Sequence, residues 1–199
     1  MLGFSLGLAL VLTGPADAPS PGGTAASGPD TACVVMDLAL EGRMSPLDSL
    51  SVRVGNAVVK VCYGRPSARG RTMIGGKDVP YQHLWRTGAN EPTMIHVTEP
   101  VRFAGLHVPA GSYSLYTIPG ADEWVVIVNR SITQWGHIAR YTSRVRELEV
   151  GRATVRAERL ERHVETMTFR SEPRPDGGAT LLLEWEHTRI RLPVARASS

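Results

Sequence analysis

The sequence predicts an all-β fold in a single domain. From about Ser45 onward the chain consists of short apolar runs separated by Gly, Pro, Asn and Asp, which is the pattern of strands joined by turns. Apolar and polar residues alternate within several runs, as in strands with one buried face. Only residues 138–149 have a composition suited to a short helix. We therefore expect an antiparallel β-sandwich of about eight to ten strands, with a distorted barrel as second choice.

The strands can be located from their turns. Two strands are expected on either side of Gly55-Asn56, which is a two-residue hairpin signal. Further strands follow across residues 93–129, where Gly- and Pro-containing turns separate the apolar runs. Residues 124–128 are apolar on both faces, which predicts a central strand.

The last strands carry an alternation that changes phase. The apolar positions are first Leu181, Leu183 and Trp185, and then Ile190, Leu192 and Val194. Because strand side chains alternate between faces with a period of two, this shift requires a bulge or a turn, which we place near residues 187–189.

The start of the chain is typical of an exported protein. The twelve residues MLGFSLGLALVL are apolar, which is long enough for the core of a secretory signal but too short to span a bilayer. We predict a signal peptide over residues 1–18, a Pro-, Gly- and Ala-rich linker over 19–44, the β domain over 45–195 and a tail over 196–199. The mature chain is expected in the periplasm or outside the cell, without stable membrane insertion.

The two cysteines, Cys33 and Cys62, fit an oxidising compartment. In an exported domain an isolated pair most simply forms a disulfide, which here would close a loop of about 30 residues and tie the segment before the domain to a strand. The alternative is two unpaired structural thiols, because free cysteines are usually buried.

The charge pattern argues against nucleic acid as a partner. The net charge is +3, but the basic residues are 20 Arg and only two Lys, and the Arg are scattered singly between acids. A nucleic-acid surface would require basic residues clustered together, commonly with aromatic residues among them.

Two consecutive stretches, residues 62–82 and 83–96, contain an unusual density of polar groups and turn residues. Irregular loops of specific shape on a β scaffold often carry function. Guanidinium groups bind carboxylates and phosphates in a bidentate manner, so these stretches suggest a pocket for a small anionic or saccharide ligand. The candidate binding residues are Arg65, Arg69, Arg71, Asp78, Tyr81, Trp85, Arg86 and Asn90.

Two other interpretations remain open. In the first, the protein is a hydrolase or lyase acting on such a ligand, with Glu91 as the acid or base. In the second, the arginines pair with Glu91, Asp78 or backbone carbonyls, and the domain is a non-catalytic structural or interaction module.

No established catalytic motif supports the enzymatic interpretation. The sequence contains no nucleophile elbow, Walker loop or H-E-x-x-H segment. The six His are widely separated in the sequence, so we predict no metal site and no cofactor.

The segments YGRPSARGR, VPYQHLWRTGANEPT, VPAGSYSLYTIPG, EWVVIVN and LLLEWEHTRIRLPV resemble the bacterial domain-of-unknown-function family numbered 2911. The resemblance extends from residue 45 to residue 194. It implies a mostly-β, typically exported bacterial domain. It implies no activity, because the family has none assigned.

Overall fold

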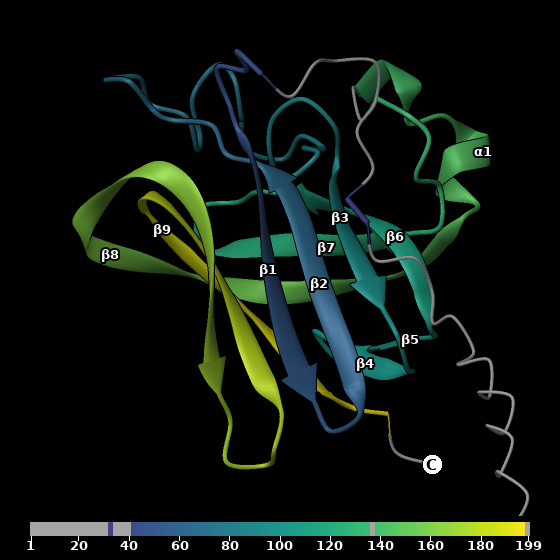
Figure 1. Cartoon of the computed structure of the whole chain (residues 1–199). Helices are drawn as coiled ribbons and strands as arrows, with labels where there is room; N and C mark the ends of the chain where they lie inside the picture. Colours follow the sequence, from purple (N-terminus) through teal and green to yellow (C-terminus); the bar gives the residue numbers. More distant parts are fainter. Residues whose placement is uncertain (1–31, 34–40, 136–137, 198–199) are drawn as a thin grey trace, which may run out of the picture.

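The computed structural model describes residues 32–33, 41–135 and 138–197, and these contain nine strands and two short helical segments (Figure 1). The strands are β1 (Leu47–Val54), β2 (Ala57–Gly64), β3 (Thr93–Val97), β4 (Val101–Phe103), β5 (Leu106–Val108), β6 (Gly111–Ile118), β7 (Glu123–Asn129), β8 (Glu149–Pro173) and β9 (Ala179–Arg196). A 3-10 turn, η1 (Ile138–Arg140), and one helix, α1 (Ser143–Arg146), lie between β7 and β8, where the sequence predicted helical turns.

The strands form one continuous sheet in the order β1-β2-β3-β6-β7-β8-β9-β4-β5, and every neighbouring pair is antiparallel. This confirms the prediction of a single antiparallel all-β domain. The sheet does not close into a barrel, since β1 and β5 are its two end strands.

The sheet folds over on itself because β8 is long and bent. The first part of β8 pairs with β7, and residues 157–173 pair with β9. In Figure 1, β8 and β9 bend together at the left of the molecule. Side chains from distant parts of the sheet consequently share one core, in which Val54 and Val61 of the first two strands join Leu183 and Leu192 of β9. The two halves thus enclose the core in the manner of a sandwich.

The expected turns are present. Val54 pairs with Ala57 across Gly55-Asn56, and Gly55 has a φ of 62°, which a two-residue hairpin requires at this position. β7 lies fifth among the nine strands, so the predicted central strand is confirmed.

The change of phase in β9 occurs at Glu186, slightly earlier than the predicted residues 187–189. Glu186 has a φ of 52°, and the register between β8 and β9 shifts on both sides of the pair that it forms with Val164. Its carboxylate accepts hydrogen bonds from the backbone N–H groups of Met73 (3.0 Å) and Ile74 (2.8 Å). The irregularity therefore directs an acidic side chain onto the β2–β3 loop.

Cys33 and Cys62 form a disulfide with a Cα–Cα distance of 5.6 Å, which confirms the predicted bridge over the alternative of two free thiols. The bridge ties the segment before the domain to β2.

The predicted signal peptide lies outside the described residues, as does most of the predicted linker. Residues 41–44 of that linker are described, and β9 continues to Arg196, the first residue of the predicted tail. In the part of the chain that the structure describes, no helix is long and apolar enough to cross a bilayer.

Candidate functional site

The two polar stretches form the loop between β2 and β3, which lies at the same end of the sheet as α1, at the top of Figure 1. Close packing holds this loop against the end of β2. A Cβ atom on Gly64 would lie 2.1 Å from the carbonyl oxygen of Ala89, so only glycine allows this approach.

The loop also has an unusual backbone. Of the six non-glycine residues with positive φ in the described chain, four lie here: Arg69, Gln82, Thr87 and Asn90. Such conformations cost about 1 to 3 kcal/mol each and persist only where the surrounding structure fixes them. The loop is therefore a shaped element and not a linker.

Arg65 binds the neighbouring strands. Its guanidinium donates to the carbonyl of Met167 (3.3 Å) and the hydroxyl of Thr168 (2.9 Å), and it lies 3.3 Å from a carboxylate oxygen of Asp48. These contacts connect the start of the loop to β8 and β1, which is a structural role.

Arg69 and Arg71 also bind protein groups. Arg69 donates to the carbonyl of Met44 (3.2 Å), and its side chain is exposed. Arg71 donates to Asp78 (3.0 Å) and to the carbonyls of Ser67 and Ala68. The predicted pairing of an arginine with Asp78 is thus present within the loop.

Glu91 forms a bidentate ion pair with Arg43. Both guanidinium–carboxylate distances are 2.8 Å, and each side chain is only 4% exposed. Next to it, the amide of Asn90 donates to the carbonyl of Ser45 (3.0 Å). Both residues therefore hold the segment that precedes β1 against the β2–β3 loop.

The two aromatic candidates occupy different environments. Trp85 is buried in the core, where it stacks on Trp185 at a centroid distance of 5.8 Å and donates its indole N–H to the carbonyl of Gly88. Tyr81 is 42% exposed and packs over Gly75. Trp85 is therefore mainly a core residue and not an open platform for a sugar.

Arg86 differs from the other candidate arginines. It donates one hydrogen bond, to the carbonyl of Trp135 (3.2 Å), and no carboxylate of the described residues lies within ion-pair distance of it. Its side chain is half-buried, and burial lowers the pKa of its guanidinium below the ordinary value, although Tyr116 and Glu91 act in the opposite direction at longer range.

Arg86 lines a hollow of about 230 Å³. The other lining residues are Asp78, Pro80, His83, Leu84, Trp85 and Ile138. Arg65, Arg69, Tyr81 and Asn90 are not among them. The structure thus brings Asp78, Trp85 and Arg86 together around one space, whereas the remaining candidates contact other parts of the fold.

Tyr116 lies near Arg86. Trp85 pairs with Thr117 in an antiparallel bridge, and Tyr116, the residue before Thr117, is close enough to act electrostatically on the Arg86 guanidinium. The hydroxyl of Tyr116 is fully buried and makes no hydrogen bond of normal geometry, although Ser114 lies close enough to affect its pKa. Burial raises the pKa of Tyr116 well above its ordinary value, so the hydroxyl remains protonated.

Gln134 contributes a second buried polar group without a partner. Both polar atoms of its side-chain amide are buried and make no hydrogen bond with the described protein. Its neighbour in the chain, Trp135, provides the carbonyl that Arg86 binds. Buried polar groups without partners are rare, and each requires an explanation such as an ordered water or ion.

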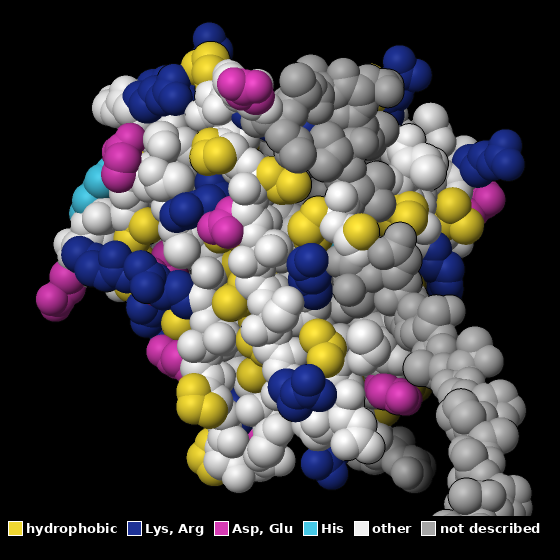
Figure 2. All heavy atoms as spheres, in the orientation of Figure 1, with side chains coloured by type: hydrophobic (Ala, Val, Ile, Leu, Met, Phe, Trp, Pro, Cys, Tyr) yellow, Lys and Arg dark blue, Asp and Glu magenta, His cyan; other side chains and the backbone are white. Residues whose placement is uncertain are grey.

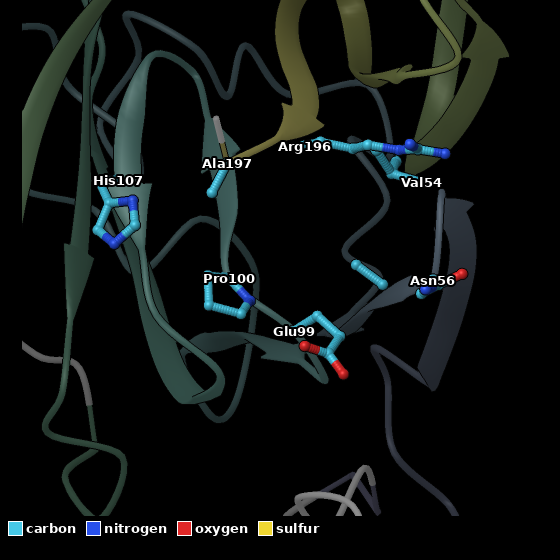
Figure 3. Close-up of a pocket in the computed structure, with 8 residues that line it drawn as sticks. Val54, Asn56, Glu99, Pro100, His107, Arg196 and Ala197 are labelled. Atoms are coloured by element: carbon cyan, nitrogen blue, oxygen red, sulfur yellow. The ribbon is translucent and has the colours of Figure 1, made fainter. Parts of the chain in front are cut away.

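A larger hollow, of about 570 Å³, lies beside the β1–β2 turn (Figure 3). Its ionisable residues are Glu99, His107 and Arg196. Figure 3 shows them spread around the rim and not converging on one point, with Arg196 extended past Val54. This arrangement lacks the mutual geometry that a catalytic group and its partner require.

Sequence reasoning missed a second set of converging arginines, on β8 and β9. Arg162, Arg170 and Arg189 all contact the carboxylate of Glu184, which is fully buried. Figure 2 shows basic side chains gathered over this part of the molecule, at the left, with acidic ones at their edge. The four residues are scattered between positions 162 and 189, so no local motif indicated that they meet.

Arg43 was also missed, because the sequence placed it in a linker. A single arginine in a Gly- and Ala-rich stretch has no local signal for burial. Among the described residues, no group of three or more His, Cys, Asp or Glu side chains could hold a metal ion.

The fold and site define the protein as a single-domain antiparallel β protein whose arginine-rich loop binds neighbouring protein groups and borders a small hollow. A family model described as "Protein of unknown function (DUF2911)" matches residues 45–194, and the chain belongs to this family. No curated protein and no solved structure matches the chain at a significant level.

Proposed function

We propose that the protein is an exported binding protein that takes a small anion, with a carboxylate or phosphate group, at the hollow beside Arg86. The observation that carries the proposal is Arg86, a half-buried residue that lines the hollow and forms no ion pair with a described residue. A partly desolvated cation without a direct ion pair is costly, and an anionic ligand would offset that cost.

The size of the hollow supports a small ligand. At about 230 Å³ it is smaller than the range of about 300 to 1,000 Å³ that is usual for drug-sized ligands. Because Trp85 is buried in the core, stacking of a neutral sugar is less well supported than capture of an acid. An acidic sugar would be recognised through its carboxylate.

The other candidate residues support a structural role. Arg65, Arg71 and Glu91 each bind protein groups, so they hold the loop that shapes the hollow. The acid–base role of Glu91 stays a prediction, and its carboxylate is occupied by Arg43 in this structure. We therefore assign no reaction to the hollow.

Export is part of the proposal. It rests on the apolar run at residues 1–12 and on the Cys33–Cys62 disulfide, because disulfides persist mainly in oxidising compartments.

A thermal-shift and calorimetric titration tests the binding proposal. The probes are acetate, succinate, inorganic phosphate and glucuronate, with glucose as the neutral comparator. At a concentration near 100 Kd a bound anion stabilises the protein by about 2.7 kcal/mol, and the midpoint of unfolding rises accordingly. Arg86→Gln should weaken binding at least tenfold, which is about 1.4 kcal/mol.

The matched control is Arg53→Gln, because Arg53 is exposed on β1 and forms no side-chain hydrogen bond or ion pair with a described residue. It removes the same charge and should leave affinity unchanged. The proposal fails if no acidic probe binds, if binding survives Arg86→Gln, or if Arg86→Gln without ligand unfolds several degrees below the control. The last result would assign Arg86 a purely structural role.

A further inference from the structure

A second arginine-lined hollow, of about 490 Å³, lies away from the β2–β3 loop, and we refer to it as the groove. It is formed by the β4–β5 turn, the β7-paired part of β8 and the end of β9. Four of its ten lining residues are arginines: Arg102, Arg156, Arg174 and Arg191. The four come from three strands and from the β8–β9 turn, so the fold and not a local motif brings them together.

The position of these arginines follows from the strand pairing. Arg102 of β4 pairs with Ala195 of β9, and Arg191, Pro193 and Ala195 alternate along β9 on one face. The backbone N–H of Ala104 donates to the carbonyl of Pro193 (2.7 Å), which holds the β4–β5 turn beside β9.

Two of the four guanidiniums are held in place by carboxylates. Arg191 contacts Glu158 and Glu172, each at 2.8 Å, and Arg174 contacts Asp176 at 2.9 Å. A guanidinium carries five N–H donors, so these contacts leave donors available on both residues. Their orientation is set before any ligand arrives, which lowers the entropic cost of binding.

The other two arginines have no ion pair within the described part of the chain. Arg102 donates one long hydrogen bond, of 3.4 Å, to the carbonyl of Gly105. Arg156 makes no side-chain hydrogen bond or ion pair with any described residue. Arg156 also lines a neighbouring hollow together with Asp122 and Glu123, and it pairs with Glu123 across β7 and β8.

The lining of the groove also includes the apolar residues Ala104, Val155, Pro193 and Ala195. Ligand sites combine such apolar surface with a few charged groups that fix orientation, and the volume lies within the usual range of about 300 to 1,000 Å³.

We propose that this groove binds a small polyanion, a compact molecule with two or more carboxylate or phosphate groups. A single acidic group would satisfy one guanidinium, whereas a groove lined by four arginines suits a ligand that engages more than one of them through bidentate contacts. The site is independent of the hollow at Arg86, since the two share no lining residue.

Isothermal titration calorimetry on the full chain tests this assignment. Citrate and pyrophosphate are the probes, and acetate and inorganic phosphate are the comparators with one acidic group. We expect both probes, or one of them, to bind at physiological ionic strength at least tenfold more tightly than its comparator. Binding of citrate alone identifies a polycarboxylate, and binding of pyrophosphate alone identifies a polyphosphate.

The double variant Arg102→Gln with Arg156→Gln should weaken binding of the probe at least tenfold. Its matched control is the double variant Arg53→Gln with Arg140→Gln, which removes the same charge from exposed residues that do not line the groove. The control should change affinity less than twofold. Equal losses in both doubles would indicate non-specific attraction and overturn the assignment, as would the absence of binding by either probe.

Arg86→Gln separates the two sites. If it abolishes acetate or phosphate binding and leaves polyanion binding intact, both proposals stand. If polyanion binding falls with Arg86→Gln and not with the Arg102 and Arg156 double, the groove proposal fails while the hollow at Arg86 is retained.

Discussion

Two buried carboxylates, Glu91 and Glu184, both bind arginines, but the arginines differ in their exposure to solvent. Glu91 binds Arg43 in a bidentate pair, and both side chains are 4% exposed. Glu184 is fully buried, but the three guanidiniums around it are between 21% and 57% exposed. The first is a buried ion pair between two segments, whereas the second is a buried anchor for cations that reach solvent.

This difference shows what each pairing can do. A buried pair has little attraction left for a ligand, and its main effect is to fix one segment against another. An open network keeps donors at the surface, where basic side chains gather at the left of Figure 2 with acidic ones at their edge. Arginine density in the sequence therefore does not by itself identify a binding site, because burial decides which role applies.

The largest expected effect comes from breaking the Glu91 pair. Glu91→Gln removes the carboxylate charge beside a buried guanidinium and should lower the free energy of unfolding by about 3 to 5 kcal/mol. Urea unfolding followed by circular dichroism measures this change, with the exposed Glu99→Gln as control. If Glu91→Gln lowers the free energy of unfolding by no more than the control does, the pair does not stabilise the fold.

The disulfide ties the same N-terminal segment to the domain and provides a second way to release it. Cys33→Ser with Cys62→Ser opens a loop of 29 residues, which the chain-entropy model values at about 3 to 4 kcal/mol. Because Arg43 and Cys33 belong to one segment, we expect the loss to be less than additive with Glu91→Gln in a double-mutant cycle. Full additivity would mean that the two attachments act independently.

The Glu184 network should make stability depend on acid pH. Burial raises the pKa of Glu184, but hydrogen bonds and charges from Arg189 and Arg162 outweigh it, so the pKa lies below the ordinary value. A depressed folded-state pKa stabilises the protein above the unfolded value of about 4.3, and this contribution is lost as the pH falls through the folded-state pKa.

Glu184→Gln should remove that contribution, costing about 1.5 to 3 kcal/mol at neutral pH and less in acid. Unfolding measured from neutral to acid pH tests this, with the exposed Glu161→Gln on β8 as control. If the variant and the wild type lose unfolding free energy equally as the pH falls below about 4.3, Glu184 is not the source of the pH dependence.

The smallest effect is expected at Arg71. Its pair with Asp78 has side chains that are 53% and 41% exposed. Exposed pairs contribute about 0 to 1 kcal/mol, so Arg71→Ala should change stability by less than 1 kcal/mol. A larger loss, measured by the same urea titration, would mean that its hydrogen bonds to the carbonyls of Ser67 and Ala68 hold the loop.

Much of the fold was predictable from local patterns. The Gly55-Asn56 turn, the apolar run at 124–128 and the phase change near Glu186 each act through neighbouring residues, and each is present. The continuous 25-residue strand β8 was not specified by the sequence. Its bend depends on register shifts against β9, which are long-range pairings that no local signal determines.

The site was less predictable than the fold. The polar density of residues 64–91 located a shaped loop, but its arginines could pair with protein groups or face a ligand with the same composition. The structure separates Arg86, which forms no ion pair with a described residue, from Arg65 and Arg71, whose carboxylate partners are Asp48 and Asp78.

The sequence by itself determined the all-β class, the turns and the disulfide pair, because periodicity, turn chemistry and a lone even pair of cysteines are properties of short segments or of composition. Only the tertiary structure decided which carboxylate meets which guanidinium and which cations line a groove. The partners are separated by up to dozens of residues, as with Arg43 and Glu91, and a charge becomes structural or available for binding only once the fold has set its burial.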